Sequence, residues 1–184
     1  MAKETQKIAL LVMDVQPGIV DRLDDKDQYL TRLKSVIDSA REKQILVIYV
    51  VVGFRPGFPE VSTRNKSFST IKQTLSDSFA NPKPAIKPAK SESVVVKRRV
   101  SAFSGSDLEI LLRAGGIEHL VLTGIATSGV VLSTLREAAD KDFQLTVLSD
   151  LCVDFDSEIH AVLTQKVFPK QAEVLTSRQW INEK

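Results

Sequence analysis

Short runs of apolar residues recur along the chain, and each has the length of a β-strand. They cover residues 8–13, 45–52, 94–96, 120–122, 145–148 and, more weakly, 172–175. Continuous apolar runs are typical of strands that are buried on both faces, as in a parallel sheet. The pattern therefore predicts that these runs form the strands of one parallel sheet.

The stretches between the runs show the spacing of amphipathic helices. Between residues 29 and 43, for example, Leu30, Leu33, Ile37 and Ala40 fall on one helical face. Helices are expected at 29–43, from a cap at Ser106 to the stop at Gly115-Gly116, at 130–141 and at 157–167. Strands that alternate with helices predict an α/β fold with helices on both faces of the sheet. We expect a single domain over residues 1–184.

One long segment, residues 53–88, is rich in proline and fits neither pattern. We expect it to be irregular, with a short helix near 69–75. A long loop in a compact domain often acts as a lid or a binding loop. This segment is therefore expected to border a ligand pocket.

Polar residues follow several of the apolar runs. Asp14 follows the first run, Lys97 the third, residues 123–129 the fourth, and Asp150 and Cys152 the fifth. Ligands bind at the carboxyl ends of the strands in parallel sheets. These residues are therefore candidates for one site at that edge, although Asp14 could also cap a turn and Lys97 could belong to a solvated basic patch.

Composition narrows the function classes. The formal net charge is only +2, with 25 basic and 23 acidic residues, and gives no reason to expect nucleic acid as a partner. No apolar run approaches the ~20 residues of a membrane span, and the N-terminus lacks the pattern of a signal peptide. A lone cysteine, Cys152, fits a reducing compartment. We therefore expect a cytoplasmic protein that acts on a small molecule.

Three motifs in order resemble the isochorismatase-like (cysteine hydrolase) family, which includes nicotinamidases, carbamoylsarcosine amidase and isochorismatases. They are Met13-Asp14-Val15-Gln16, the segment from Lys97 to Phe103, and the segment from Gly124 to Thr134. The resemblance extends over nearly the whole chain. It implies a three-layer αβα, Rossmann-like fold with a six-stranded parallel sheet, and a dimer or larger homo-oligomer.

The resemblance also implies positions for a catalytic set. Asp14 matches the family aspartate and Lys97 the family lysine, whereas the family cysteine falls at Val130. A cis peptide bond is expected between Ile125 and Ala126. We also expect substrate contacts from a further set of residues, not all of which the resemblance itself implies: Gln16, Arg55, Phe103, Ile125, Ala126, Thr127 and Gly129.

Without a thiol at position 130, the covalent route of the family amidases is closed, because valine has no lone pair. Isochorismatases also lack the cysteine and hydrolyse a vinyl ether, which needs a proton donor instead. The hypothesis is that Asp14 is the general acid or base and that Lys97 orients the substrate and balances charge. Gln16 would orient the substrate or water.

Isochorismate carries two carboxylates, which arginine binds in a bidentate manner. Arg55 and Arg64 lie in the proline-rich loop and are candidates for this contact, or are solvated loop charges. His119 and His160 have no partner at metal-ligand spacing, and the region 51–65 lacks the histidines of metal-binding nicotinamidases. We therefore expect no metal and no other cofactor.

Three functions stay open at this point. The first is a hydrolase of a small anionic molecule that works without a cysteine. The second is a pseudo-enzyme or binding protein that keeps the pocket but catalyses nothing. The third is an amidase that uses Cys152 as its nucleophile, against which stands the simpler interpretation of a buried thiol.

Overall fold

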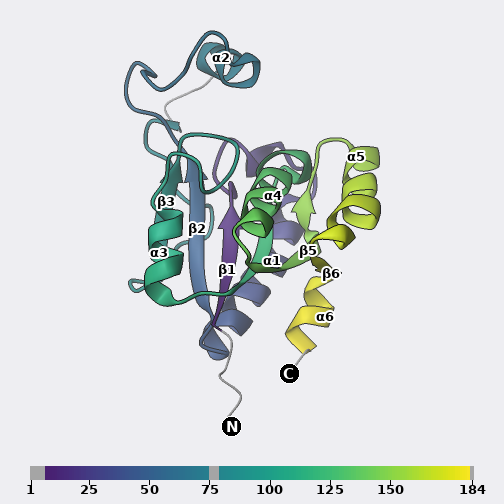
Figure 1. Cartoon of the computed structure of the whole chain (residues 1–184). Helices are drawn as coiled ribbons and strands as arrows, with labels where there is room; N and C mark the ends of the chain where they lie inside the picture. Colours follow the sequence, from purple (N-terminus) through teal and green to yellow (C-terminus); the bar gives the residue numbers. More distant parts are fainter. Residues whose placement is uncertain (1–6, 75–78, 183–184) are drawn as a thin grey trace.

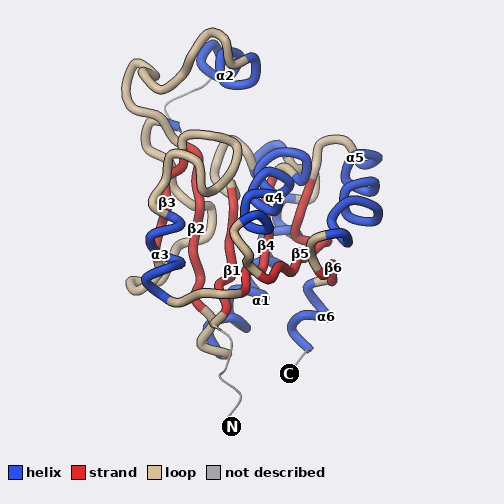
Figure 2. The backbone as a smooth tube through the Cα atoms, in the orientation of Figure 1, coloured by secondary structure: helices blue, strands red, loops and turns tan. Residues whose placement is uncertain are grey.

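The computed structural model describes residues 7–74 and 79–182. Its centre is a six-stranded parallel sheet with the strand order β3-β2-β1-β4-β5-β6, shown in Figures 1 and 2. The strands are β1 (Ile8–Met13), β2 (Leu46–Val52), β3 (Ser93–Lys97), β4 (His119–Ile125), β5 (Gln144–Val153) and β6 (Glu173–Leu175). The predicted parallel sheet is confirmed.

Helices cover both faces of this sheet. One face packs against α3 (Leu108–Gly115), α4 (Leu132–Asp140), the short π-helix η4 (Leu163–Val167) and the 3₁₀ helix η5 (Phe168–Lys170). The other face packs against α1 (Lys26–Glu42) and α6 (Ser177–Asn182). Side chains of β1 alternate between the two cores: Leu11 and Met13 face the first, and Leu10 and Val12 the second. This is why the strand reads as a continuous apolar run.

The remaining elements lie near the carboxyl ends of the strands. They are η1 (Val20–Arg22), α2 (Lys66–Thr74), η3 (Thr127–Val131) and α5 (Ser157–Val162). In Figure 1, α2 stands beyond the carboxyl end of the sheet, away from the layers of helices. Five buried side chains pack it onto the rest of the molecule in a small separate core, formed by Val52, Phe54, Val61, Phe68 and Phe79.

Two elements differ from the sequence prediction. The predicted helix at 130–141 is preceded by the short π-helix η3 and continues as α4. The predicted helix at 157–167 begins as α5 and ends in a second short π-helix, η4. Strand β5 continues to Val153, so Asp150 and Cys152 lie within the strand and do not follow it. The β4–β5 pairing shifts register between Leu122 and Gly124: Leu122 pairs with Val147 and Gly124 with Cys152, and the extra residues of β5 between these pairs include Asp150.

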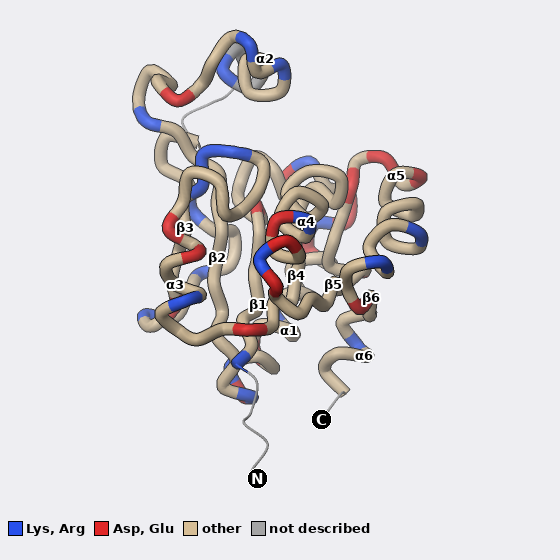
Figure 3. Tube along the Cα trace, in the orientation of Figure 1, with Lys and Arg blue, Asp and Glu red and all other residues tan. Residues whose placement is uncertain are grey.

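Charged residues of both signs are spread over the helices and loops in Figure 3, with a short basic segment beyond β3. Among the described residues, no helix is long and apolar enough to cross a membrane.

Candidate active site

Asp14 stands at the end of β1, the strand between β2 and β4. Its backbone φ of 57° lies in the left-handed region, which aspartate tolerates better than most residues. Its N–H donates to the Val50 carbonyl at 2.8 Å, so the chain turns while it stays bonded to β2. The side chain is thereby held in the interior, and the residue is only 6% exposed.

Lys97 is the last residue of β3 and is buried as well. Its Nζ lies 3.0 Å from Asp14 Oδ2, and it donates to the carbonyls of Arg99 at 2.9 Å and Val100 at 3.0 Å. An ammonium has three N–H donors, and these three acceptors match them. The two residues that the sequence analysis singled out, far apart in the chain, form one ion pair.

The segment that supplies those carbonyls is fixed from behind by α4. Ala102 N–H donates to Thr134 Oγ1 at 2.9 Å, and the Ser101 hydroxyl donates to Glu137 Oε2 at 2.6 Å. Ser133 and Thr134 belong to the third motif of the sequence, so part of that motif holds the lysine segment in place.

The two oxygens of the Asp14 carboxylate differ. Oδ2 faces Lys97, whereas Oδ1 is buried and accepts no hydrogen bond from any described residue. Burial raises the pKa of Asp14 from 3.8 to about 6, and the nearby Lys97 ammonium only partly opposes this. A carboxyl with such a pKa can carry or accept a proton near neutral pH.

The turn after β4 brings a third segment to the pair. Gly124 has φ 155°, and a Cβ at this position would lie 2.5 Å from the Met13 carbonyl oxygen, so only glycine allows β4 to lie this close to β1. The expected cis peptide bond between Ile125 and Ala126 is confirmed. The N–H groups of Ser128, Gly129 and Val131 already donate to Asp154 or to the Ala126 carbonyl. These three donors are therefore not offered to an anion.

A pocket of about 260 Å³ opens beside Asp14 and Lys97. Its wall is mostly apolar, and it includes four of the other residues expected at the site: Ile125, Ala126, Gly129 and Val130. The family cysteine position, Val130, thus borders the same space as the carboxylate. The volume is below the ~300–1,000 Å³ of pockets for drug-sized ligands, so it fits a small metabolite.

Three expected substrate contacts, Gln16, Thr127 and Phe103, are not part of the pocket wall. Gln16 is fully buried, and its amide exchanges two hydrogen bonds with the backbone of Val52. Thr127 is buried and bonds to His160 at 2.9 Å. Phe103 packs in the core beside Phe143. Each of the three supports the site from outside the pocket wall.

The arginine candidates of the proline-rich loop lie apart from the pocket wall as well. The Arg55 side chain is 67% exposed and donates to Glu60 Oε1 at 2.7 Å. Arg64 is exposed, in a turn that its backbone N–H closes on Ser62. Neither guanidinium is among the described groups that line the pocket.

Several residues of the pocket wall were not predicted from the sequence. Arg22 and Phe155 line the pocket, together with Ile19, Phe68, Phe79 and Val100. Arg22 lies in η1, which follows β1, and Phe155 follows β5. Phe155 could have been suspected as a pocket residue because it lies just after a strand. Nothing in the local sequence of either residue indicates a place in the pocket wall.

Cys152 lies in the sheet core and borders a different hollow. Its thiol donates to the Leu122 carbonyl at 3.8 Å, and burial raises its pKa well above the usual range. A thiol in this state is a poor nucleophile. In the described part of the chain, no three His, Cys, Asp or Glu side chains are grouped as metal ligands.

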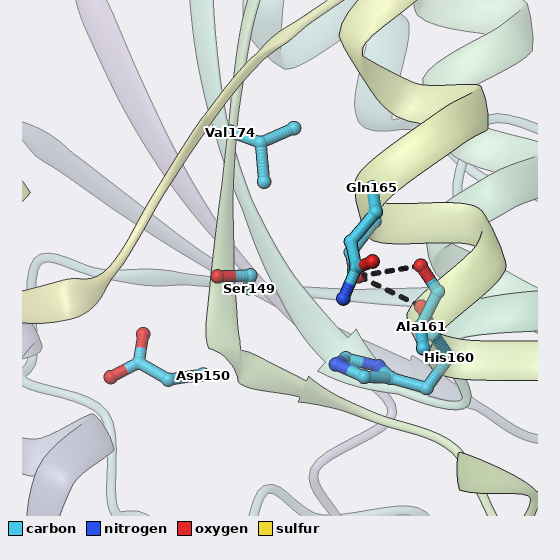
Figure 4. A pocket seen from close by; sticks show the side chains of 7 residues that line it. Ser149, Asp150, His160, Ala161, Gln165 and Val174 are labelled. Atoms are coloured by element: carbon cyan, nitrogen blue, oxygen red, sulfur yellow. Dashed lines mark hydrogen bonds between the residues drawn. The ribbon is translucent and has the colours of Figure 1, made fainter. Parts of the chain in front are cut away.

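A second hollow, of about 360 Å³, lies between β5 and α5 (Figure 4). Its acid and its imidazole are engaged in structural contacts: Asp150 accepts from the N–H and hydroxyl of Ser177, and His160 bonds to Thr127. In Figure 4 the Asp150 carboxylate points away from the His160 ring. The hollow is larger than the Asp14 pocket, but its acid and its imidazole do not form a pair.

These features define a parallel α/β protein with an acid–lysine pair at the carboxyl edge of its sheet. The isochorismatase-domain model matches residues 8–179, and the chain belongs to the isochorismatase family, a family of hydrolases.

Several relatives with known names or structures are similar along most of the chain. An uncharacterised isochorismatase family protein, YwoC of Bacillus subtilis, is 30% identical and covers 97% of this chain and 94% of its own. The ureidoacrylate amidohydrolase RutB of Variovorax paradoxus is 29% identical, with 82% and 70% covered. A protein of Arabidopsis thaliana described as a probable inactive nicotinamidase is 26% identical, with 100% and 99% covered.

Among solved structures, an isochorismatase family protein from Burkholderia thailandensis is 28% identical and superposes with a TM-score of 0.78. The match covers 94% of this chain and 92% of that one.

Proposed function

We propose that this protein is a hydrolase of a small molecule that works by proton transfer from Asp14, without a covalent intermediate. One observation carries the proposal. Asp14 is buried with one oxygen held by Lys97 and the other without a partner among the described residues, beside a pocket in which valine takes the place of a thiol. Such a carboxyl can donate and take up a proton, whereas the valine offers no thiol for a covalent route.

Vinyl-ether hydrolysis, as of isochorismate, fits this equipment. Protonated Asp14 gives its proton to the terminal carbon of the enol ether, and an oxocarbenium ion forms. Water adds to that cation and returns a proton to the Asp14 carboxylate. The hemiketal then collapses to a ketone and an alcohol, so that one water is consumed and the acid is restored.

Lys97 has a supporting part in this scheme. Its ammonium is bonded to Asp14 Oδ2 and to two carbonyls, so it holds the carboxyl in one orientation. Oδ1 is then the oxygen that exchanges the proton. Once Asp14 has given up its proton, the carboxylate faces both the ammonium and the new cation, which lowers the energy of the charged intermediate.

The test is turnover by the whole chain of isochorismate and of a panel of small amides, for the wild type and Asp14→Asn. We expect isochorismate to be cleaved and Asp14→Asn to lower kcat by at least ~10²-fold, the usual range for a lost acid–base group. Activity should fall as pH rises through about 6, because the acid form of Asp14 is then lost.

A matched control is Asp24→Asn, which makes the same change at an exposed position, and it should retain wild-type kcat. Near-normal activity in Asp14→Asn would refute the proposal. Absence of turnover for all substrates would favour the pseudo-enzyme, a description that one relative already carries in its name.

A further inference from the structure

Arg22 is the one basic residue of the pocket wall, apart from Lys97, within the described chain. It is the last residue of η1, it is exposed, and its guanidinium carbon lies 4.0 Å from the centroid of the Phe155 ring. Arg22 forms no ion pair with any residue that the structure describes. The adjacent Asp21 accepts instead from Lys26 and from the Gly18 N–H.

This arrangement leaves the guanidinium ready to bind an anion. A ring beneath a guanidinium takes up its flat face and restricts its rotation, while the N–H donors point outward in the guanidinium plane. Those in-plane donors match the two oxygens of a carboxylate. Arg22 is thus oriented without an acidic partner that an incoming anion would have to displace.

The charge balance of the pocket favours an anion as well. Asp14 and Lys97 offset each other at 3.0 Å, so Arg22 supplies the unbalanced charge of the wall. The other side chains of the wall are apolar except for Ser67, and they include Ile19, Phe68 and Phe79. The chemistry therefore suits a molecule with an apolar body and at least one carboxylate.

Arg55 and the other arginines beside it are already engaged. Glu60 accepts from Arg55 and lies 3.5 Å from Arg98, and Arg99 donates to the Glu60 carbonyl. The Arg55 guanidinium is thus paired with Glu60, whereas the Arg22 guanidinium lies at the pocket wall.

We propose that Arg22, backed by Phe155, is the carboxylate-binding residue of this pocket, and that the substrate is a small carboxylate with an apolar body. The inference rests on the proposed function only in placing the substrate in this pocket. Its test can therefore use binding alone, without turnover.

The probes are benzoate and its neutral counterpart benzamide, with dissociation constants measured by calorimetry on the full chain at low salt. We expect benzoate to bind the wild type more tightly than benzamide. Arg22→Gln should weaken benzoate roughly ten- to a hundredfold, the range for a lost charge-assisted bond, and leave benzamide unchanged.

The control is Arg113→Gln, because Arg113 also lies over a phenylalanine, Phe143 at 5.0 Å, but outside this pocket. It should bind benzoate as the wild type does. Equal affinity for the two probes, no binding of benzoate, or an unchanged affinity in Arg22→Gln would each overturn the inference. A protein that binds benzoate through Arg22 but turns over nothing would refute the proposed hydrolase and leave the carboxylate site standing.

Discussion

The Asp14–Lys97 pair shows how two buried charges can be arranged unequally. Lys97 has three acceptors, whereas Asp14 has one firm partner and one oxygen without a hydrogen bond among the described residues. The lysine is therefore fixed and the acid remains reactive. Burial, the larger influence, keeps the pKa of Asp14 near 6 despite the ammonium beside it.

The sequence could name both members of the pair, because each directly follows or ends an apolar strand. It could not show which oxygen is free, since that depends on the carbonyls of Arg99 and Val100, which turn back toward Nζ. Nor could it exclude Gln16 as a substrate contact, because a glutamine that binds backbone reads the same as one that binds a ligand.

Lys97→Met should cost about 3–5 kcal/mol of unfolding free energy at pH 7, because Asp14 is then a buried charge without its partner. The folded pKa of Asp14 is raised, so protonation of this group stabilises the fold at low pH, and that contribution is lost as pH rises through about 6. The penalty of Lys97→Met should therefore be smaller at pH 5 than at pH 7. Urea denaturation at pH 5 and pH 7 measures the loss of unfolding free energy at each pH.

The exposed pair of Lys26 and Asp21 gives the matched control. Lys26→Met should leave the free energy of unfolding nearly unchanged, as is usual for surface ion pairs. Equal losses for the two lysine variants would contradict the buried-pair account.

Among the elements, the turn between β4 and α4 has two functions. It follows the end of β4, which lies against β1, and it carries Ala126, Gly129 and Val130 to the pocket wall while its outer side bonds to neighbouring segments. From α5 and the loop before it, His160 and Asp154 bond to Thr127 and Ser128 and fix the turn from outside. The sequence predicted the turn from its motif, but the contacts with α5 link segments about thirty residues apart and depend on the tertiary fold.

Gly124→Ala should destabilise the protein by at least ~2 kcal/mol, because the new Cβ would meet the Met13 carbonyl and the φ of 155° is strained for alanine. Gly129→Ala is the matched control, in the turn that follows β4. Its Cβ would find only ordinary contact, with the Ala126 Cβ at 3.9 Å, so we expect a change within ~0.5 kcal/mol. Thermal unfolding of the two variants provides the comparison, and similar losses would contradict the close approach of β4 to β1.

On the scale of the whole molecule, the protein consists of a well-covered sheet and a smaller outlying core. Both faces of the sheet are buried under helices, whereas α2 contributes Phe68 to a separate cluster that holds only four other buried apolar side chains. The strand pattern of the sequence predicted the sheet. It did not predict that Phe68 of α2 would reach the pocket wall, because the proline-rich loop has no periodicity from which to infer packing.

Native-state hydrogen exchange should show this difference. Amides at the centre of β1 and β4 should exchange at least ~10-fold more slowly than those of α2, because local opening of α2 exposes only a small apolar cluster. Mass spectrometry of peptic fragments is sufficient to separate these elements. Equal protection of α2 and the central strands would show that the molecule opens as one unit.

Catalysis by Asp14 requires that this carboxyl stay partly protonated near neutral pH. Titration of the aspartate carboxyl carbons by ¹³C NMR, in the wild type and in Asp14→Asn, measures this. We expect one carboxyl that titrates at about pH 6 and is absent from Asp14→Asn. A value for Asp14 close to the ordinary 3.8 would contradict it, because the acid form needed for catalysis would then be scarce.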